Sequence, residues 1–168
     1  MNPAPPHPNP AHPGLAWDWA VAAYAHPGVE PALLDLQDRF GQCVPLLLTA
    51  AWAAAAGRAF DEESLEAAAD AARAYDGTII GPLRAIRRTL KAPVPDLDDP
   101  ARLAIREQVK ALELDAERRL IWALEALAPA PGASGSRPIA DGLVGAAKAW
   151  TRVVPRAELT SLAARLSP

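Results

Sequence analysis

Cysteine, methionine, tyrosine, phenylalanine and histidine are scarce in this chain of 168 residues, which holds one, one, two, two and three of them. A single cysteine excludes an internal disulfide, and Cys43 stands in an apolar run, so we interpret it as a buried small hydrophobe. The histidines, His7, His12 and His26, do not have the spacing of metal ligands on a rigid element. We therefore predict neither a disulfide scaffold nor a metal site, and we expect no cofactor.

An excess of charge of either sign is also missing, because the formal net charge is only −3. Such a balance gives no global attraction to nucleic acid or to acidic lipids. The apolar run at 43–56 is shorter than the ~20 residues that a membrane-spanning helix needs. The first residues lack the basic segment and apolar run of a secretory signal. We expect a cytoplasmic protein that does not bind membranes.

Alanine and leucine are abundant and β-branched residues are few, which favours helices because Ala and Leu lose little entropy there. Apolar spacing and helix-breaking residues predict an all-α protein. The expected helices cover residues 15–25, 29–40, 44–57, 61–75, 79–91 and 99–128, with a break or bend at 76–77 and two short helices after 138.

The helix at 44–57 carries no charge on any face, which is typical of a helix surrounded by others. We predict a five- or six-helix bundle around it, formed by residues 15–128. Residues 1–14 contain six prolines and are expected to form a mobile arm. The composition of 129–138 predicts a flexible linker, and 139–168 a tethered pair of short helices.

The segment 79–91 has the clearest amphipathic pattern in the chain. Its apolar positions, Ile79, Leu83, Ile86 and Leu90, are expected to face inward. The opposite arc then forms a candidate basic docking face of Arg84, Arg87, Arg88 and Lys91. The alternative is a solvated face whose charge is balanced by the acid-rich helix at 61–75.

A polar cluster of Asp35, Gln37, Asp38 and Arg39 precedes the uncharged helix and is a candidate ligand site. The competing interpretation is a solvated helix face on which Arg39 pairs with Asp35, four residues earlier. Paired aspartates, including Asp98 and Asp99, resemble magnesium-diphosphate sites, but the latter pair is explained as a helix start. We identify no catalytic residue.

Three tryptophans are candidate interface anchors, since exposed aromatic residues dominate binding energetics. Trp17 and Trp19 lie two positions apart, so they point to nearly opposite sides of one helix. Trp150, in the C-terminal segment, is the third. For each, packing within its own domain is the alternative.

Several ordered motifs carry a family resemblance: WDWA at 17–20, YAHPGV at 24–29, LQDRFG at 36–41, LLL at 46–48 with Trp52, PLRAIRRTLK at 82–91 and REQVK at 106–110. In these segments the chain resembles a proteobacterial family of small, all-helical hypothetical proteins of unknown function, over roughly residues 15–120. The resemblance implies a coherent domain and no particular activity.

Three hypotheses for function follow, and we do not expect an enzyme. The first is a helical interaction module, an adaptor or regulatory subunit, whose partner is another protein or a second copy. The second is a small-molecule binder or enzyme in which Asp35, Asp38, Arg39 and Arg84 converge between helices. The third, with the least support, is nucleic-acid binding through the basic face of 79–91.

Overall fold

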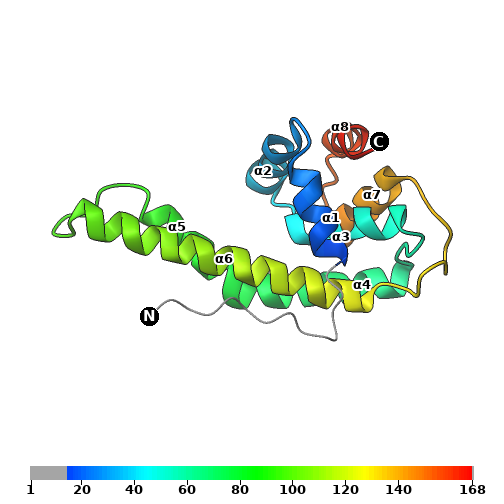
Figure 1. The fold of residues 1–168 in the computed structure, drawn as a ribbon, viewed down its shortest axis with the longest axis horizontal. Coiled ribbons are helices and arrows are strands. Elements are labelled where there is room, and N and C mark those ends of the chain that lie inside the picture. The colour runs from blue at the N-terminus through cyan, green and yellow to red at the C-terminus, as the bar shows by residue number, and fades with distance from the viewer. Residues whose placement is uncertain (1–14, 168) are drawn as a thin grey trace.

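The computed structural model describes residues 15–167, so the proline-rich arm at 1–14 lies outside the described residues. Every regular element in that range is a helix, which confirms the all-α class. The elements are α1 (Leu15–Tyr24), α2 (Val29–Phe40), α3 (Val44–Ala55), α4 (Glu62–Tyr75), η1 (Asp76–Ile80), α5 (Gly81–Thr89), α6 (Asp99–Leu127), α7 (Ile139–Trp150) and α8 (Arg156–Leu166). Figure 1 shows a body of α1, α2, α3, α7 and α8 on one side of two long helical segments.

The uncharged helix α3 lies at the centre of the body, as its composition predicts. Every residue from Val44 to Ala54 is buried. Its neighbours are α7, α6, α1, α4 and α2, and the contact with α7 is the most extensive. Thr49 is the only hydroxyl on this helix, and it donates to the carbonyl oxygen of Pro45 at 2.8 Å. This hydroxyl is therefore satisfied within its own helix.

The C-terminal helices belong to the same core, which corrects the expectation of a tethered appendage. Leu143, Ala146 and Ala147 of α7 are fully buried against the body. Gly142 allows this approach, because a Cβ atom there would lie 2.5 Å from the carbonyl oxygen of Ala50. Helix α8 then packs on α7 and α2. The small residues of α3 thus allow α7, which lies near the C-terminal end of the chain, to pack closely against it.

The segment 129–138 is held in place, so the expected flexible linker is also corrected. The Arg58 guanidinium donates to the carbonyl oxygens of Pro129 and Ala128 at 2.7 and 3.2 Å. The Arg137 amide donates to the Ala54 carbonyl at 2.9 Å. Composition alone misses these bonds because their partners, Ala54 near the end of α3 and Arg58 just after it, lie 70 or more residues earlier in the chain.

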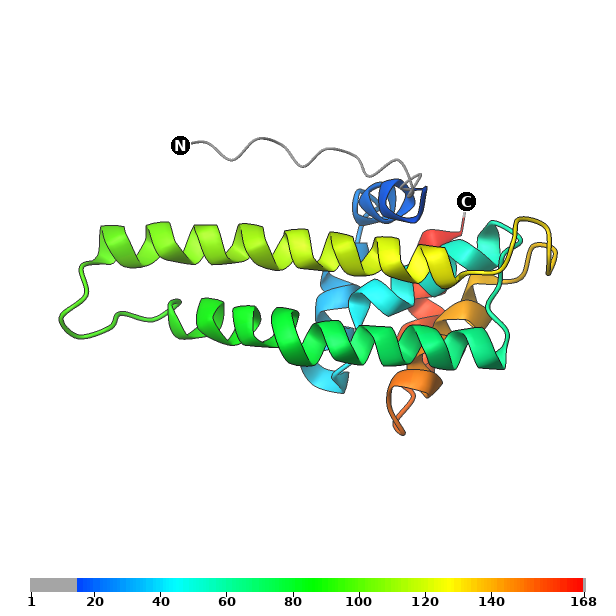
Figure 2. The same cartoon turned by 90° about the horizontal axis from the view of Figure 1, so that it is seen from below.

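The break expected at 76–77 is instead a π-helical segment, η1, that continues α4 into α5. This continuous helix lies antiparallel to α6, and together they form a hairpin that extends well beyond the body (Figure 2). A Cβ at Gly81 would lie 2.8 Å from the Asp76 carbonyl oxygen, so glycine permits the close turn. We use "hairpin" below for the projecting part formed by η1, α5 and residues 99–117 of α6.

The orientation of α5 departs in part from the expected one, although Leu83 still packs against the core and Leu90 is half-buried. Ile79 and Ile86 are 42% and 48% exposed, whereas the side chains of Arg84 and Arg87 are only 15% and 24% exposed. Helix α6 also exposes large apolar residues, Ile105, Leu112 and Leu127 among them. The physical reason is that α6 offers carboxylates to the arginines of α5.

Candidate functional sites: an ion-pair network, a polar cavity and an apolar groove

Arg84 is the centre of an ion-pair network between α5 and α6. Its guanidinium lies 3.0 Å from Glu113 and 3.1 Å from Glu117, and a third carboxylate, Asp76, lies 3.6 Å away. Glu113 is 6% exposed, so burial strengthens these interactions relative to a surface pair. Glutamates four residues apart on one helix can both reach a single guanidinium.

Two further arginines of α5 extend the network: Arg87 binds a carboxylate of α6, and Arg88 binds a carboxylate of α2. Arg87 also binds Glu113, and this hydrogen bond raises the pKa of the arginine above its ordinary value. Arg88 lies 2.7 Å from Asp38 and so connects α5 to α2. The predicted basic docking face is therefore corrected: three of its four members are paired with carboxylates, and only Lys91 lies outside the network among the described residues.

The polar cluster of α2 divides between solvent and interior. Asp35 and Arg39 form a pair at 3.1 Å whose side chains are 36% and 66% exposed, which is the local pairing expected four residues apart. Asp38 instead binds Arg88, and Gln37 borders a cavity. Asp38 thus binds Arg88, which lines the same cavity as Arg84, while Asp35 and Arg39 pair with each other outside it.

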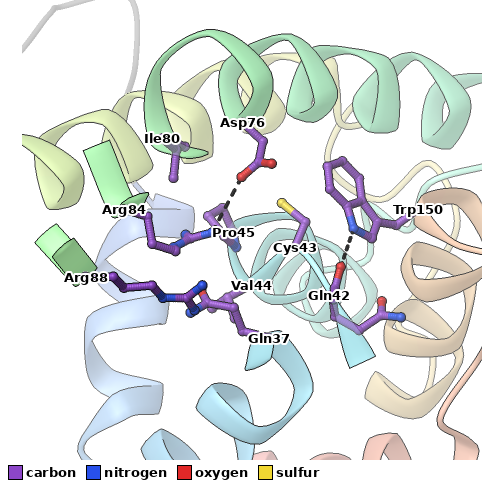
Figure 3. A pocket seen from close by; sticks show the side chains of 11 residues that line it. Gln37, Gln42, Cys43, Val44, Pro45, Asp76, Ile80, Arg84, Arg88 and Trp150 are labelled. Atoms are coloured by element: carbon purple, nitrogen blue, oxygen red, sulfur yellow. Dashed lines mark hydrogen bonds and ion pairs between the residues drawn. The ribbon is translucent and has the colours of Figure 1, made fainter. Parts of the chain in front are cut away.

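This cavity, of about 190 Å³, opens at the N-terminus of α3 (Figure 3). Its lining consists of Gln37, Gly41, Gln42, Cys43, Val44, Pro45, Asp76, Ile80, Arg84, Arg88 and Trp150. Sequence patterns missed Gln42, which is 3% exposed and whose Nε2 donates to the Thr151 hydroxyl at 3.1 Å. Within residues 15–167 its Oε1 has no hydrogen-bond partner. We refer to this space as the polar cavity.

Cys43 lies in the wall of the polar cavity with its sulfur toward the space between Asp76 and Trp150 (Figure 3). Burial raises the pKa of the thiol to about 12. The thiol therefore stays protonated near neutral pH, where a nucleophile would need the thiolate. The interpretation of Cys43 as a buried small hydrophobe is consistent with this environment.

The three candidate aromatic anchors have different environments. Trp150 is half-buried, and its indole Nε1 donates to the Gly41 carbonyl at 2.7 Å, which connects α7 to the end of α2. Trp19 is half-buried against the core. Trp17, also half-buried, has the Arg118 guanidinium 5.9 Å from its ring and borders an open groove. Trp17 is therefore the one of the three that faces a groove.

The groove beside Trp17 lies between α1, the start of α3 and α6, and its volume is about 290 Å³. Apolar groups make up most of its lining, which consists of Trp17, Ala20, Val21, Tyr24, Val44, Pro45, Leu48, Leu114, Glu117 and Ile121. Val21 and Leu114 stay 53% and 55% exposed. The buried side of α1 is formed by alanines instead, at positions 16, 20 and 23. We call this feature the apolar groove.

One end of the apolar groove is acidic. Burial raises the pKa of the Tyr24 hydroxyl to about 12, and the nearby Glu117 and Glu30 carboxylates add to the rise. Burial also raises the pKa of Glu117, and Arg84 opposes that rise. The groove therefore joins an apolar, aromatic wall to a buried carboxylate.

Residues 15–167 have neither a candidate metal site nor a candidate membrane-spanning helix. No group of three or more histidine, cysteine or acidic residues there is placed to hold a metal ion. None of the described helices is both long enough and apolar enough to cross a bilayer.

The described chain is thus an all-helical protein with a projecting hairpin, a polar cavity and an apolar groove. Residues 15–124 match a family described as a protein of unknown function, DUF2390, and the chain belongs to that family. This confirms the resemblance to hypothetical proteins of unknown function. No curated protein and no solved structure matches the chain. The family match ends within α6, so α7 and α8, which complete the core, lie outside it.

Proposed function

We propose that this protein is a helical interaction module that binds an apolar helical segment of a partner protein, carrying a basic residue, in the apolar groove. The single observation that carries the proposal is the exposed apolar lining of this groove, which ends at the Glu117 carboxylate. Peptide helices are commonly recognised in this way, with side chains at i, i+3, i+4 and i+7 inserted into a groove.

The size and the charge of the groove define the partner. A volume of about 290 Å³ is at the lower limit of the roughly 300–1,000 Å³ of small-molecule sites, so it suits a few anchoring side chains. Trp17 and Tyr24 give the wall the aromatic character of interface centres. Glu117 is already paired with Arg84 at 3.1 Å, so the exposed Glu30 near the Tyr24 hydroxyl is the carboxylate that favours a lysine or arginine at that end.

Selection from a random-peptide display library tests the proposal without a known partner. We expect the recovered peptides to have apolar residues at helical spacing next to a basic residue. Their affinity, measured by fluorescence anisotropy, should fall by on the order of tenfold or more in Val21→Glu, because a carboxylate in the wall must lose its water on binding.

Leu34→Glu is the matched control, because Leu34 is an aliphatic residue of α2 that is 46% exposed and does not line the groove. This variant should bind the selected peptides as the wild type does. Peptides that bind Val21→Glu as tightly as the wild type would exclude the groove as the binding site. A selection without apolar and basic enrichment would contradict the proposed partner chemistry.

A second candidate function is the binding of a small polar molecule in the polar cavity, favoured by the buried Gln42 Oε1 without a partner. A ligand with a hydrogen-bond donor would satisfy this acceptor. Thermal-shift screening with small polar metabolites should then give a rise in Tm that Gln37→Ala removes. Arg39→Ala, outside the cavity, should keep that rise.

Nucleic-acid binding has less support, because Arg84, Arg87 and Arg88 already face carboxylates. We infer a cytoplasmic location from the one buried cysteine, since secreted domains of this size often rely on disulfides.

A further inference from the structure

The apolar groove lies next to the point where the described chain begins. Trp17, the third residue of α1, lines the groove, and so does Tyr24, the last residue of that helix. At 1.5 Å per residue, these two aromatic residues are about 10 Å apart along the helix axis. The 14 residues that precede α1 are therefore attached to the chain beside the Trp17 end of the groove.

These 14 residues, which lie outside the described residues, carry prolines at a regular spacing. Three pairs of prolines follow the pattern Pro-x-x-Pro: Pro3 and Pro6, Pro5 and Pro8, and Pro10 and Pro13. A polyproline II helix has three residues per turn, so both members of such a pair lie on one face of it. Proteins that recognise segments of this kind hold the proline rings against aromatic side chains in a groove.

The apolar groove has a wall of the kind that holds proline rings. Between its two aromatic residues, Val21 is 53% exposed on α1, and Leu114 of α6 is 55% exposed. The Tyr24 hydroxyl has its pKa raised to about 12 by burial, so it stays protonated and can donate to a carbonyl oxygen. A polyproline II segment leaves its carbonyl groups free, because it has no internal hydrogen bonds.

The composition of the proline-rich arm also fits the groove. The arm contains no aspartate or glutamate, so nothing in it is repelled by Glu30 at the acidic end of the groove. Apart from Met1, its apolar side chains are those of proline and alanine. The prolines are therefore the groups of the arm that can cover the apolar wall.

The arm is long enough to return along α1. Pro13 and Gly14 are the residues favoured at the two central positions of a type II turn, so this pair favours a reversal of the chain immediately before Leu15. Beyond such a turn, a polyproline II segment rises about 3.1 Å per residue. About four residues then cover the distance between Trp17 and Tyr24, and the arm has 12 residues before Pro13.

We propose that the proline-rich arm occupies the apolar groove of its own chain and so competes with the partner segment. This inference rests on the groove being the binding site proposed above. Covalent attachment gives the arm an effective concentration in the millimolar range, so a weak contact is sufficient. An arm that is bound about nine-tenths of the time lowers the apparent affinity for a partner about tenfold.

Paramagnetic NMR of the full chain locates the arm without any partner. A nitroxide on Asn9→Cys can be attached selectively, because Cys43 is 8% exposed and its thiol stays protonated. We expect the label to broaden the methyl resonances of Leu114, which lines the groove. Val21→Glu should reduce this broadening, because a carboxylate in the wall must lose its water when the arm binds.

Leu127 is the control resonance. It is 40% exposed, does not line the groove, and lies near the start of α1, because Glu125 accepts the Ala16 amide at 3.1 Å. An arm that does not bind the groove should broaden Leu127 at least as strongly as Leu114. Leu34→Glu, which changes α2 outside the groove, should leave the broadening of Leu114 as it is in the labelled parent protein.

Peptide affinity measures the competition. Serine in place of Pro5, Pro8 and Pro10 should raise the affinity for the selected peptides by about threefold or more, because the arm then leaves the groove. The control has serine in place of Ala4, His7 and Ala11, which keeps every proline, and it should bind the peptides as the wild type does.

The two measurements separate this inference from the proposed function. Equal broadening of Leu114 and Leu127, or broadening of Leu114 that Val21→Glu does not change, would overturn the inference whether or not peptides bind the groove. Equal peptide affinity of the wild type and the proline-to-serine variant would also overturn it. A library selection without peptides that depend on Val21 would overturn the proposed function, and the NMR result does not rely on that selection.

Discussion

The body and the hairpin of this protein are held together by opposite kinds of contact. In the body, α3 and α7 meet through alanines, leucines and a glycine, with no ion pair between them. In the hairpin, α5 and α6 meet through Arg84, Arg87 and Glu113, while isoleucines face outward. The same chain thus has one region with an apolar interior and one whose interior combines ion pairs with apolar residues such as Ile80 and Val109.

This difference determines how much apolar surface each region leaves exposed to water. An apolar interior is stabilised by removal from water alone and needs no outside contact. A charged interior leaves the aliphatic residues of the same helices on the surface, where burial against another molecule would lower their free energy. The hairpin therefore exposes aliphatic side chains while several of its charged ones are paired between the helices.

Core truncation in the body should have the largest effect. Leu47 is 1% exposed in α3, and Leu47→Ala should lower the free energy of unfolding by about 3 kcal/mol, through lost burial and a cavity. Leu112→Ala, the same change at a residue 57% exposed in the hairpin, should alter it by less than about 0.5 kcal/mol. Urea denaturation measures both. Equal losses would contradict the assignment of an apolar interior to the body alone.

Loss of Glu113, the central carboxylate of the hairpin, should cause the second-largest loss of stability. Glu113→Ala leaves Arg84 and Arg87 partly buried with one acceptor fewer, and should cost about 2 kcal/mol after allowance for their partial exposure. Urea denaturation, which adds no salt of its own, measures this loss of stability at low and high salt concentration. Added salt should reduce the loss. Asp35→Ala, which removes the exposed pair with Arg39, should leave the unfolding midpoint unchanged within error.

The close approach of α7 to α3 predicts a smaller, steric effect. Gly142→Ala should lower stability by about 1–2 kcal/mol, because its Cβ would meet the backbone oxygen of Ala50 at 2.5 Å. Gly145→Ala on the same helix meets only the flexible Leu65 side chain at 3.2 Å. That variant should be neutral or slightly stabilising through helix propensity. Thermal unfolding compares the two, and equal losses of Tm would show that the helix-to-helix distance is not set at Gly142.

The pH dependence of stability should give the smallest effects, with opposite signs for two acids of α6. Burial raises the pKa of Glu117 above its ordinary 4.5, so the folded state binds the proton more tightly and stability falls as pH rises through this range. The hydrogen bond from Arg119 lowers the pKa of Asp115, so its contribution is present above about 3.8 and is lost as pH falls.

Denaturation at a series of pH values from about 3 to 7 separates the two acids. Relative to Glu117→Gln, the wild type should lose stability as pH rises. Relative to Asp115→Asn, it should gain stability over the same interval. The same sign for both variants would contradict the environments described for these two carboxylates.

Much of the fold follows from local patterns in the sequence. The predicted starts and ends of most helices lie within a few residues of the observed ones, because their signals are local. Asp98, for example, accepts a hydrogen bond from the Ala101 amide at 2.9 Å and begins α6. Asp61 and Ser64 form a reciprocal capping box at the start of α4.

The candidate sites were less predictable. Gln37, Arg84, Arg88 and Trp150 were identified as residues of interest, but the polar cavity also needs Gln42, which is 108 positions from Trp150. Their meeting depends on the docking of α7 and α8, which no periodicity encodes. Helical spacing did indicate that α5 has two different faces, but it did not indicate which of them turns inward.

The sequence by itself determined that this protein is all-helical, where its helices lie, and that the uncharged segment around Thr49 is buried at the centre. These properties depend on propensity, capping and composition, which act over a few residues. Only the tertiary structure decided that Arg84 and Arg87 of α5 face inward and that α7 and α8 complete the core. The reason is that a charged face can be buried when carboxylates such as Glu113 lie opposite, and such pairs join positions 26 or more residues apart.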